Sequence, residues 1–161
     1  MSESTYKKDF PITWEALHLN TKALAWKLHE KNKNWKGIIA ITRGGMVPAC
    51  IVARELEILN IETFCITSYD VKEQSTTKIL KKPETVDNEG EGWLVIDDLV
   101  DTGKTFEIAR EHYPKAHYAC IYVKPLGLKQ TDTYITDFTQ DTWVHFPWDM
   151  ENQYATPLAR L

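Results

Sequence analysis

The sequence predicts an α/β fold in which a largely parallel central sheet is flanked by helices. Short apolar runs of the kind that form buried strands alternate with longer stretches whose apolar residues recur at helical spacing. Three of the apolar runs end in polar turns, at residues 43–45, 97–105 and 124–125. Because the carboxyl ends of parallel strands lie at one edge of a sheet, we expect these turns to form a single site.

The composition is that of one ordinary globular domain, which we assign to residues 1–161. The sequence has no repeat, no low-complexity tract and no Gly/Ser-rich linker, and 43% of it is hydrophobic. A net charge of −4 argues against a nucleic-acid partner that binds through a broad basic face. Three widely spaced cysteines are typical of free thiols in the cytoplasm, and no apolar run is long enough to span a membrane.

The first half of the chain is predicted to form two helices and two strands. A helix over residues 12–32 begins at Thr13, whose side chain is a suitable N-cap. The apolar run at 36–42 predicts a buried strand, because it is continuous rather than alternating. The stretch 46–58 predicts a second helix, and 61–67 a second strand.

The second half is predicted to begin with a long polar loop over residues 68–92, with at most a short strand at 78–80. A loop of that length inside a compact domain is usually functional or disordered. The order beyond it is a strand at 93–98, a helix at 104–113, strands at 115–125 and 131–138, and an aromatic segment at 141–150.

The segment "VIDDLVDTGKT" (95–105) ends in Gly-Lys-Thr, as a nucleotide-binding P-loop does. A P-loop also requires a glycine five positions before Gly103, and Asp98 stands there. A carboxylate at that position would face the triphosphate that the backbone should wrap. The P-loop interpretation is therefore rejected.

The same segment has the chemistry of a ribose 5-phosphate site. Adjacent carboxylates at a strand end, Asp97 and Asp98, suit a divalent cation or a vicinal diol. The following turn enters a helix directly, so its backbone N–H groups, with the hydroxyls of Thr102 and Thr105, can hold one phosphate monoester. If this turn requires positive φ at Lys104, lysine adopts it at some cost.

These features resemble the type I phosphoribosyltransferases, in which a hydrophobic strand, two acids and a short loop close on Thr-Gly. The segments "WKGIIAITRGGMVPACIVAREL", "CITSYD", "REHYPKAH", "VKP" and "QDTWVHFPWDM" extend the resemblance over nearly the whole chain. It implies the type I phosphoribosyltransferase fold, with a flexible lid at about 69–88 and a small C-terminal hood at about 133–161 that binds the base.

The resemblance implies a purine salvage enzyme. Such an enzyme transfers the phosphoribosyl group of PRPP to N9 of guanine and xanthine, and of hypoxanthine less well. The products are GMP or XMP and pyrophosphate, and Mg²⁺ is the cofactor.

The resemblance also assigns roles on the phosphate side of the site. Arg43 and Gly44 match the pyrophosphate loop, where the family has a cis non-proline peptide, and Lys78 is the lid's candidate contact with pyrophosphate. Asp97 and Asp98 would hold the ribose hydroxyls, with Asp98 the metal ligand. The 5-phosphate loop is Thr102, Gly103, Lys104 and Thr105, with Asp101 beside it.

On the base side, Asp101 is the candidate general acid/base near N7 of the purine. Lys124 would donate to O6, which favours 6-oxopurines over adenine. Trp143 would stack on the base, the backbone around Val144 would contact its 2-position edge, and Asp149 would contact the 2-substituent.

Several alternatives stay open at this point. A preference for hypoxanthine and guanine would require only small changes in the pocket, and a PRPP-sensing regulatory protein would use the same fold. The resemblance further implies a homo-oligomer, a tetramer or a dimer, and it allows a peripheral association with the cytoplasmic face of the inner membrane.

Overall fold

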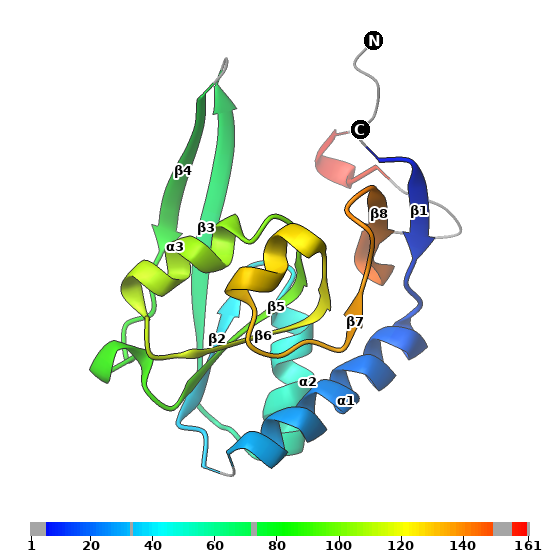
Figure 1. Cartoon of the computed structure of the whole chain (residues 1–161). Helices are drawn as coiled ribbons and strands as arrows, with labels where there is room; N and C mark the ends of the chain where they lie inside the picture. Colours follow the sequence, from blue (N-terminus) through cyan, green and yellow to red (C-terminus); the bar gives the residue numbers. More distant parts are fainter. Residues whose placement is uncertain (1–5, 33, 72–73, 150–155, 161) are drawn as a thin grey trace.

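The computed structural model describes residues 6–32, 34–71, 74–149 and 156–160, and its centre is a six-stranded sheet of order β4-β3-β2-β5-β6-β7. The strands are β2 (Gly37–Ile41), β3 (Ile61–Val71), β4 (Gln74–Lys81), β5 (Trp93–Val100), β6 (His117–Val123) and β7 (Thr136–Asp137). All neighbouring pairs are parallel except β3 and β4. The predicted α/β class with a largely parallel sheet is confirmed (Figure 1).

Three α-helices cover the two faces of this sheet: α1 (Trp14–Lys31), α2 (Met46–Leu56) and α3 (Lys104–His112). Along β2, Ile38 and Ala40 pack in the core cluster that contains α1 and α2. Ile39 and Ile41 pack instead in the cluster that contains α3. Because successive strand residues point to opposite faces, α1 and α2 lie on one face and α3 on the other.

The predicted helix starts agree with the structure to within two residues. Thr13 is the N-cap of α1, and its hydroxyl oxygen accepts a hydrogen bond from the backbone N–H of Ala16 at 3.1 Å. This bond satisfies one of the donors that the first turn of any helix leaves open.

The expected polar loop is wrong over much of its length, because residues 61–71 and 74–81 form a long antiparallel hairpin. Its register pairs Ile66 with Ile79 and Thr67 with Lys78. Polar residues predominate in the sequence of its outer part, which therefore lacks the apolar alternation that indicates a strand. Backbone pairing between the two arms forms the strands instead. The hairpin extends well beyond the rest of the sheet (Figure 1).

A second, two-stranded parallel sheet forms at the other side of the molecule, where β1 (Lys8–Pro11) pairs with β8 (Thr142–His145). Its strands come from opposite ends of the chain, and β1 is absent from the predicted elements. The expected strand at 131–138 is reduced to β7 and an isolated bridge at Thr133. The short 3-10 helices are Asn88–Gly90, Pro125–Gln130, Pro147–Asp149 and Leu158–Arg160.

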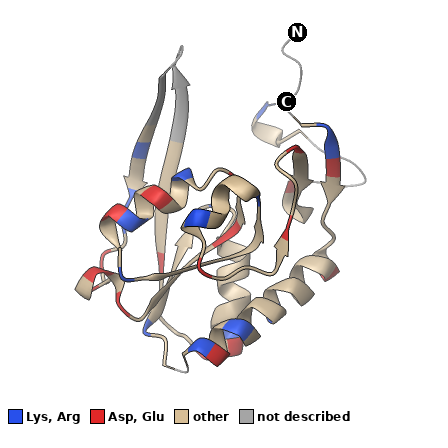
Figure 2. Ribbon diagram, viewed as in Figure 1, with Lys and Arg blue, Asp and Glu red and all other residues tan. Residues whose placement is uncertain are grey.

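The hairpin and the β1–β8 sheet both stand above the carboxyl ends of the parallel strands (Figure 1). Figure 2 shows basic and acidic residues interspersed along the ribbon of the described elements, with no long run of basic residues in that view. No helix within the described ranges is both long enough and apolar enough to cross a membrane.

Candidate functional site

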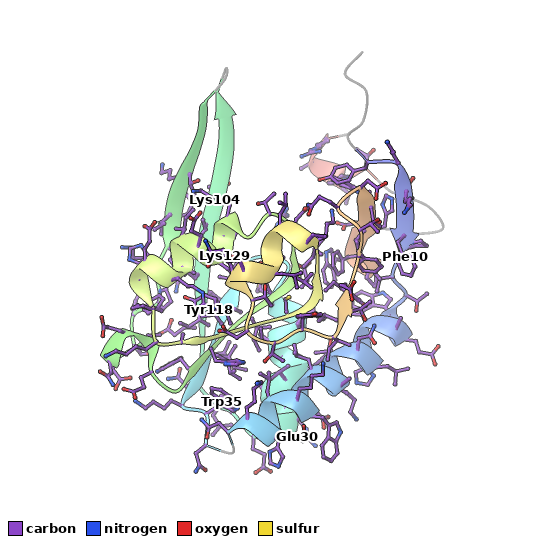
Figure 3. The ribbon with its side chains drawn as sticks, viewed as in Figure 1. Phe10, Glu30, Trp35, Lys104, Tyr118 and Lys129 are labelled. Carbon is purple, nitrogen blue, oxygen red and sulfur yellow. The ribbon has the colours of Figure 1, made fainter. Side chains whose placement is uncertain are left out.

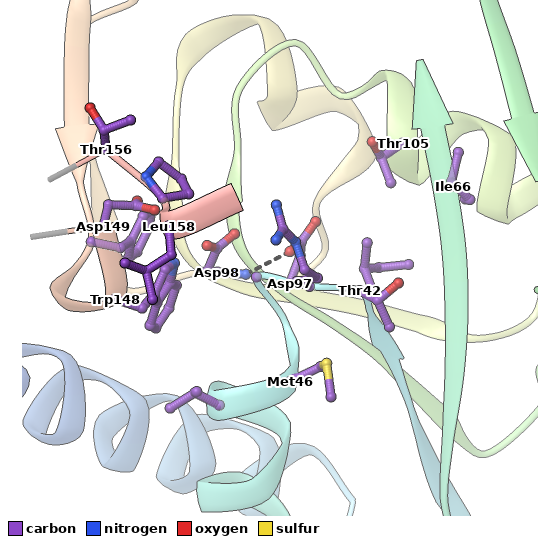
Figure 4. Close-up of a pocket in the computed structure, with 16 residues that line it drawn as sticks. Thr42, Met46, Ile66, Asp97, Asp98, Thr105, Trp148, Asp149, Thr156 and Leu158 are labelled. Carbon is purple, nitrogen blue, oxygen red and sulfur yellow. Dashed lines mark hydrogen bonds between the residues drawn. The ribbon is translucent and has the colours of Figure 1, made fainter. Parts of the chain in front are cut away.

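A cleft of about 910 Å³ opens at the carboxyl ends of β2 and β5, between the hairpin and the C-terminal segment. Figure 4 shows Ile66 and Thr105 on one side, Trp148, Asp149 and Leu158 on the other, and the acid pair between them. Residues from several parts of the chain line it, including Arg43, Gly44, Ile66, Asp97, Asp98, Thr105, Trp148, Asp149 and Leu158. Two of the three polar turns predicted to converge therefore do so here.

The acid pair sits at the end of β5, where Asp97 is buried and Asp98 is half-buried. Asp97 accepts a hydrogen bond from the backbone N–H of Asp98 at 2.9 Å, and Asp98 accepts one from Leu99 at 2.6 Å. Burial and the neighbouring charge of Asp98 raise the pKa of Asp97, and burial also raises that of Asp98. These carboxylates would be stabilised in the charged form by a cation in the cleft.

The turn after β2 packs tightly against this acid pair. The Thr42–Arg43 peptide bond is cis, as the resemblance implies. A methyl group added at Gly44 would overlap the carboxylate of Asp98, and one at Gly45 would overlap the carbonyl oxygen of Ile96. Glycine is therefore required at both positions for the turn to approach β5 so closely.

Replacing Gly44 with alanine is expected to weaken PRPP binding about 10- to 100-fold, since overpacking strain is typically about 1–3 kcal/mol. The measurement is the Kd for PRPP with Mg²⁺, made on Gly44→Ala, Asp98→Ala and the double variant. Because the overlap is with the Asp98 carboxylate, Gly44→Ala should add little to Asp98→Ala. Fully additive losses would show that the overlap has no effect on the site.

The predicted phosphate loop leads from β5 into α3 and surrounds a smaller pocket of about 120 Å³. Gly103 adopts φ +85° and is the N-cap of α3. The turn requires positive φ at Gly103 and not at Lys104, so the condition under which lysine would be strained is not met. Thr105 lines both this pocket and the main cleft, so the two cavities lie next to each other. The N–H groups at the start of α3 are suited to an anion there.

The Lys104 side chain, which Figure 3 labels, is 65% exposed. Its ammonium nitrogen lies 3.1 Å from Oε2 of Glu107, three residues along α3. We therefore expect Lys104→Gly to change PRPP affinity less than about fivefold, since exposed ion pairs contribute at most about 1 kcal/mol. The backbone N–H at this position is retained. Thr105→Val, which removes a hydroxyl from the pocket, is the positive control and should weaken binding. A loss for Lys104→Gly as large as that for Thr105→Val would place the ammonium on the phosphate.

Asp101 is the centre of a second cluster, on the base side of the loop. The ammonium group of Lys124, a side chain only 1% exposed, donates to Asp101 Oδ2 at 2.7 Å. The amide of Gln140 donates to Asp101 Oδ1, and Gln140 also accepts from the backbone N–H of Leu126 at 3.1 Å. Gln140 was missed from the sequence, because an uncharged amide in a loop carries no motif signal.

The base-side residues on β8 alternate as a strand requires. Trp143 is 44% exposed, whereas the side chain of Val144 is buried in the core beside α1 and α2. The predicted contact of a base with this residue would therefore involve its backbone and not its side chain. Tyr6, which the sequence did not single out, lies edge-on to Trp143 with ring centroids 4.7 Å apart.

Two predicted residues lie apart from this cluster. Asp149 lines the main cleft, where its charge helps to raise the pKa of Asp98. Lys124 and Trp143 lie elsewhere, in contact with Asp101 and Tyr6. Lys78 is exposed on β4 and pairs with Thr67. The next pair in the register, Ile66 with Ile79, contains a residue that lines the cleft. Because successive strand residues point to opposite faces, the Lys78 side chain projects from the face of the hairpin that is turned away from the cleft.

Comparison with known proteins shows the family to which the chain belongs. Residues 13–155 match the phosphoribosyl transferase domain family. The chain is 56% identical over 155 residues to a xanthine-guanine phosphoribosyltransferase of Nitratidesulfovibrio vulgaris (strain DP4), covering 96% of this chain and 93% of the relative. It is 56% identical over 153 residues to the enzyme of that name from Desulfotalea psychrophila, covering 95% and 94%. Among solved structures, a purine phosphoribosyltransferase from Pyrococcus horikoshii superposes with a TM-score of 0.73 at 26% identity, covering 92% and 99%.

Proposed function

Because the chain belongs to the phosphoribosyltransferase family, we propose that it is a purine salvage enzyme that transfers the phosphoribosyl group of PRPP to N9 of guanine and xanthine, and of hypoxanthine less well. The products are GMP or XMP and pyrophosphate. The observation that carries the proposal is the loop from Asp97 to Thr105, which joins an acid pair, a phosphate pocket and the Asp101–Lys124 pair. The names of the curated relatives support the choice of bases.

In this proposal Asp97 and Asp98 hold the ribose hydroxyls, and the loop from Thr102 to Thr105 holds the 5-phosphate. Arg43 faces the departing pyrophosphate from the tight turn after β2, where a guanidinium fork suits a diphosphate. The reacting carbon then lies between groups held at fixed positions by the sheet. Positioning of this kind supplies much of the barrier reduction when two substrates must meet.

The acid pair also fits Mg²⁺, with Asp98 as the ligand. Buried carboxylates whose pKa is raised by burial gain from a cation beside them. Magnesium is usually held by one or two carboxylates and completes its shell with water and substrate oxygens. Among the described residues no group of three or more His, Cys, Asp or Glu is arranged to hold a metal ion, so the proposed site relies on the acid pair together with substrate and water oxygens. When bound, the ion neutralises the departing pyrophosphate.

On the base side, Lys124 donates to O6 of the purine and Asp101 exchanges a proton at N7. Trp143 stacks on the ring, and the backbone of Val144 contacts the 2-position edge. The Lys124 ammonium is buried, so it meets O6 without competition from water, which strengthens the bond. An ammonium cannot accept from the amine of adenine, and 6-oxopurines are therefore preferred.

The direct test is an activity panel with PRPP, Mg²⁺ and guanine, xanthine, hypoxanthine or adenine. We expect GMP and XMP at the highest kcat/KM, IMP at a lower value and almost no AMP. Absence of turnover with every 6-oxopurine would refute the proposal. A higher kcat/KM for hypoxanthine than for xanthine would instead favour a hypoxanthine-guanine enzyme, since small pocket differences change such ratios about 10- to 200-fold.

We also propose that the enzyme is a cytoplasmic homo-oligomer, a dimer or a tetramer, with peripheral attachment to the inner membrane as a further expectation. Exposed apolar side chains on α1 support self-association: Leu19 is 60% exposed and Trp26 is 68% exposed. Light scattering after size-exclusion chromatography tests the oligomer, and co-sedimentation with anionic vesicles tests the attachment.

A further inference from the structure

Tyr6 reaches from the N-terminal segment into the cluster assigned to the base. Its hydroxyl donates to Asp101 Oδ2 at 3.3 Å. Its ring lies edge-on to Trp143, with centroids 4.7 Å apart and planes at 72°. The ammonium nitrogen of Lys124 lies 4.7 Å from the centre of the same ring. One side chain thus contacts all three groups that would bind a purine by its N7, its O6 and its face.

The position of Tyr6 follows from the β1–β8 sheet. Lys8 pairs with Thr142, and the backbone N–H of Lys7 donates to the carbonyl of Asp141 at 2.9 Å. This register places Tyr6 beside the residues just before β8, from where its ring contacts Trp143. Tyr6 is therefore directed to the base side by strand pairing.

The contacts of Tyr6 are the same in kind as those of a purine. A flat ring interacts with Trp143, and the Lys124 ammonium faces an electron-rich surface. The Tyr6 hydroxyl donates a hydrogen bond to Asp101, as a protonated purine nitrogen would. Burial and the charge of Asp101 raise the pKa of Tyr6, so the hydroxyl stays protonated and keeps donating at neutral pH. A purine in contact with Asp101, Lys124 and Trp143 would need the space that this ring fills.

We propose that Tyr6 is an intramolecular competitor of the purine: its side chain occupies the base subsite when no base is bound and must withdraw before a base can enter. This inference rests on the proposed function, because it takes the Asp101–Lys124–Trp143 cluster to be the base subsite. The apparent affinity for any ligand of that subsite then equals the intrinsic affinity multiplied by the fraction of molecules in which Tyr6 has withdrawn.

The test compares the affinities of the untagged full-length protein for two ligands, GMP and ribose 5-phosphate. GMP occupies the base subsite, the acid pair and the phosphate loop, whereas ribose 5-phosphate occupies only the acid pair and the loop. Tyr6→Ala should tighten GMP binding about tenfold and leave ribose 5-phosphate unchanged, by calorimetry. Tyr6→Phe, which keeps the ring and loses the bond to Asp101, should tighten GMP about threefold. Lys7→Ala, an exposed neighbour on the same segment, should change neither affinity.

The outcomes separate the inference from the proposed function. If the wild-type protein binds GMP and Tyr6→Ala binds it equally or more weakly, Tyr6 does not compete with the base. A weaker affinity would mean that Tyr6 covers the bound purine instead. If the wild-type protein binds neither ligand, the proposed function fails and the inference fails with it. In steady state, Tyr6→Ala should lower the KM for xanthine and for guanine by similar factors.

Discussion

Replacing Asp101 with asparagine is expected to lower the rate of the chemical step about 10²- to 10⁴-fold, the range typical of a lost general acid/base. Asparagine has nearly the shape of aspartate and still offers one acceptor to the Lys124 ammonium. It cannot exchange a proton with N7 of the purine. The affinity for PRPP should stay within about threefold, because the phosphate loop beside it is unchanged.

This measurement is best made in a single turnover, where product release cannot hide the chemical step. Asp137→Asn is a suitable control, since Asp137 is an exposed carboxylate on β7 outside the cluster. A single-turnover rate for Asp101→Asn equal to that of the wild type would remove Asp101 from proton transfer. A large loss of PRPP affinity with an unchanged rate would assign it to substrate binding.

Replacing Lys124 with methionine is expected to raise the KM for guanine and xanthine about 10- to 100-fold, because a hydrogen bond from a charged donor contributes about 1.5–3 kcal/mol. The preference for guanine over adenine should fall by a similar factor. Methionine fills the buried space of the lysine stem, so the packing around β6 is largely kept.

Loss of the ammonium also leaves Asp101 with Gln140 and Tyr6 as its hydrogen-bond partners. Thermal unfolding should be recorded beside the kinetics, with the exposed Lys129→Met as the control. An unaltered ratio of kcat/KM for guanine and adenine in a folded Lys124→Met protein would contradict the contact with O6.

The fold and most of the candidate site follow from local chemistry that a sequence displays. The two acids, the Thr-Gly turn and the start of the helix are continuous in the sequence. Their positions relative to one another therefore follow from the local geometry of a strand that turns into a helix. The turn at Arg43 reaches the same edge because parallel strands end together. Assignment of these residues therefore needs little knowledge of distant contacts.

The features that sequence reasoning missed depend on pairing between distant segments. The sequence of the outer hairpin is mostly polar and gives no local strand pattern, and its two strands pair with each other. Strand β1 has four exposed residues and no apolar alternation. It pairs with β8, which lies more than 130 residues later, so the pattern of neighbouring residues cannot predict the pairing. Tyr6 and Gln140 enter the site only as a result of such long-range contacts.

The pairing of β1 with β8 has a consequence for the order in which the enzyme forms during synthesis. The strand that begins at Lys8 can pair with β8 only after Thr142 has left the ribosome, roughly 7–27 seconds later at ordinary elongation rates. The elements β2, α2, β5 and α3 are complete well before that time. The half of the enzyme assigned to phosphate can therefore form while translation continues, whereas the half assigned to the purine must wait for the end of the chain.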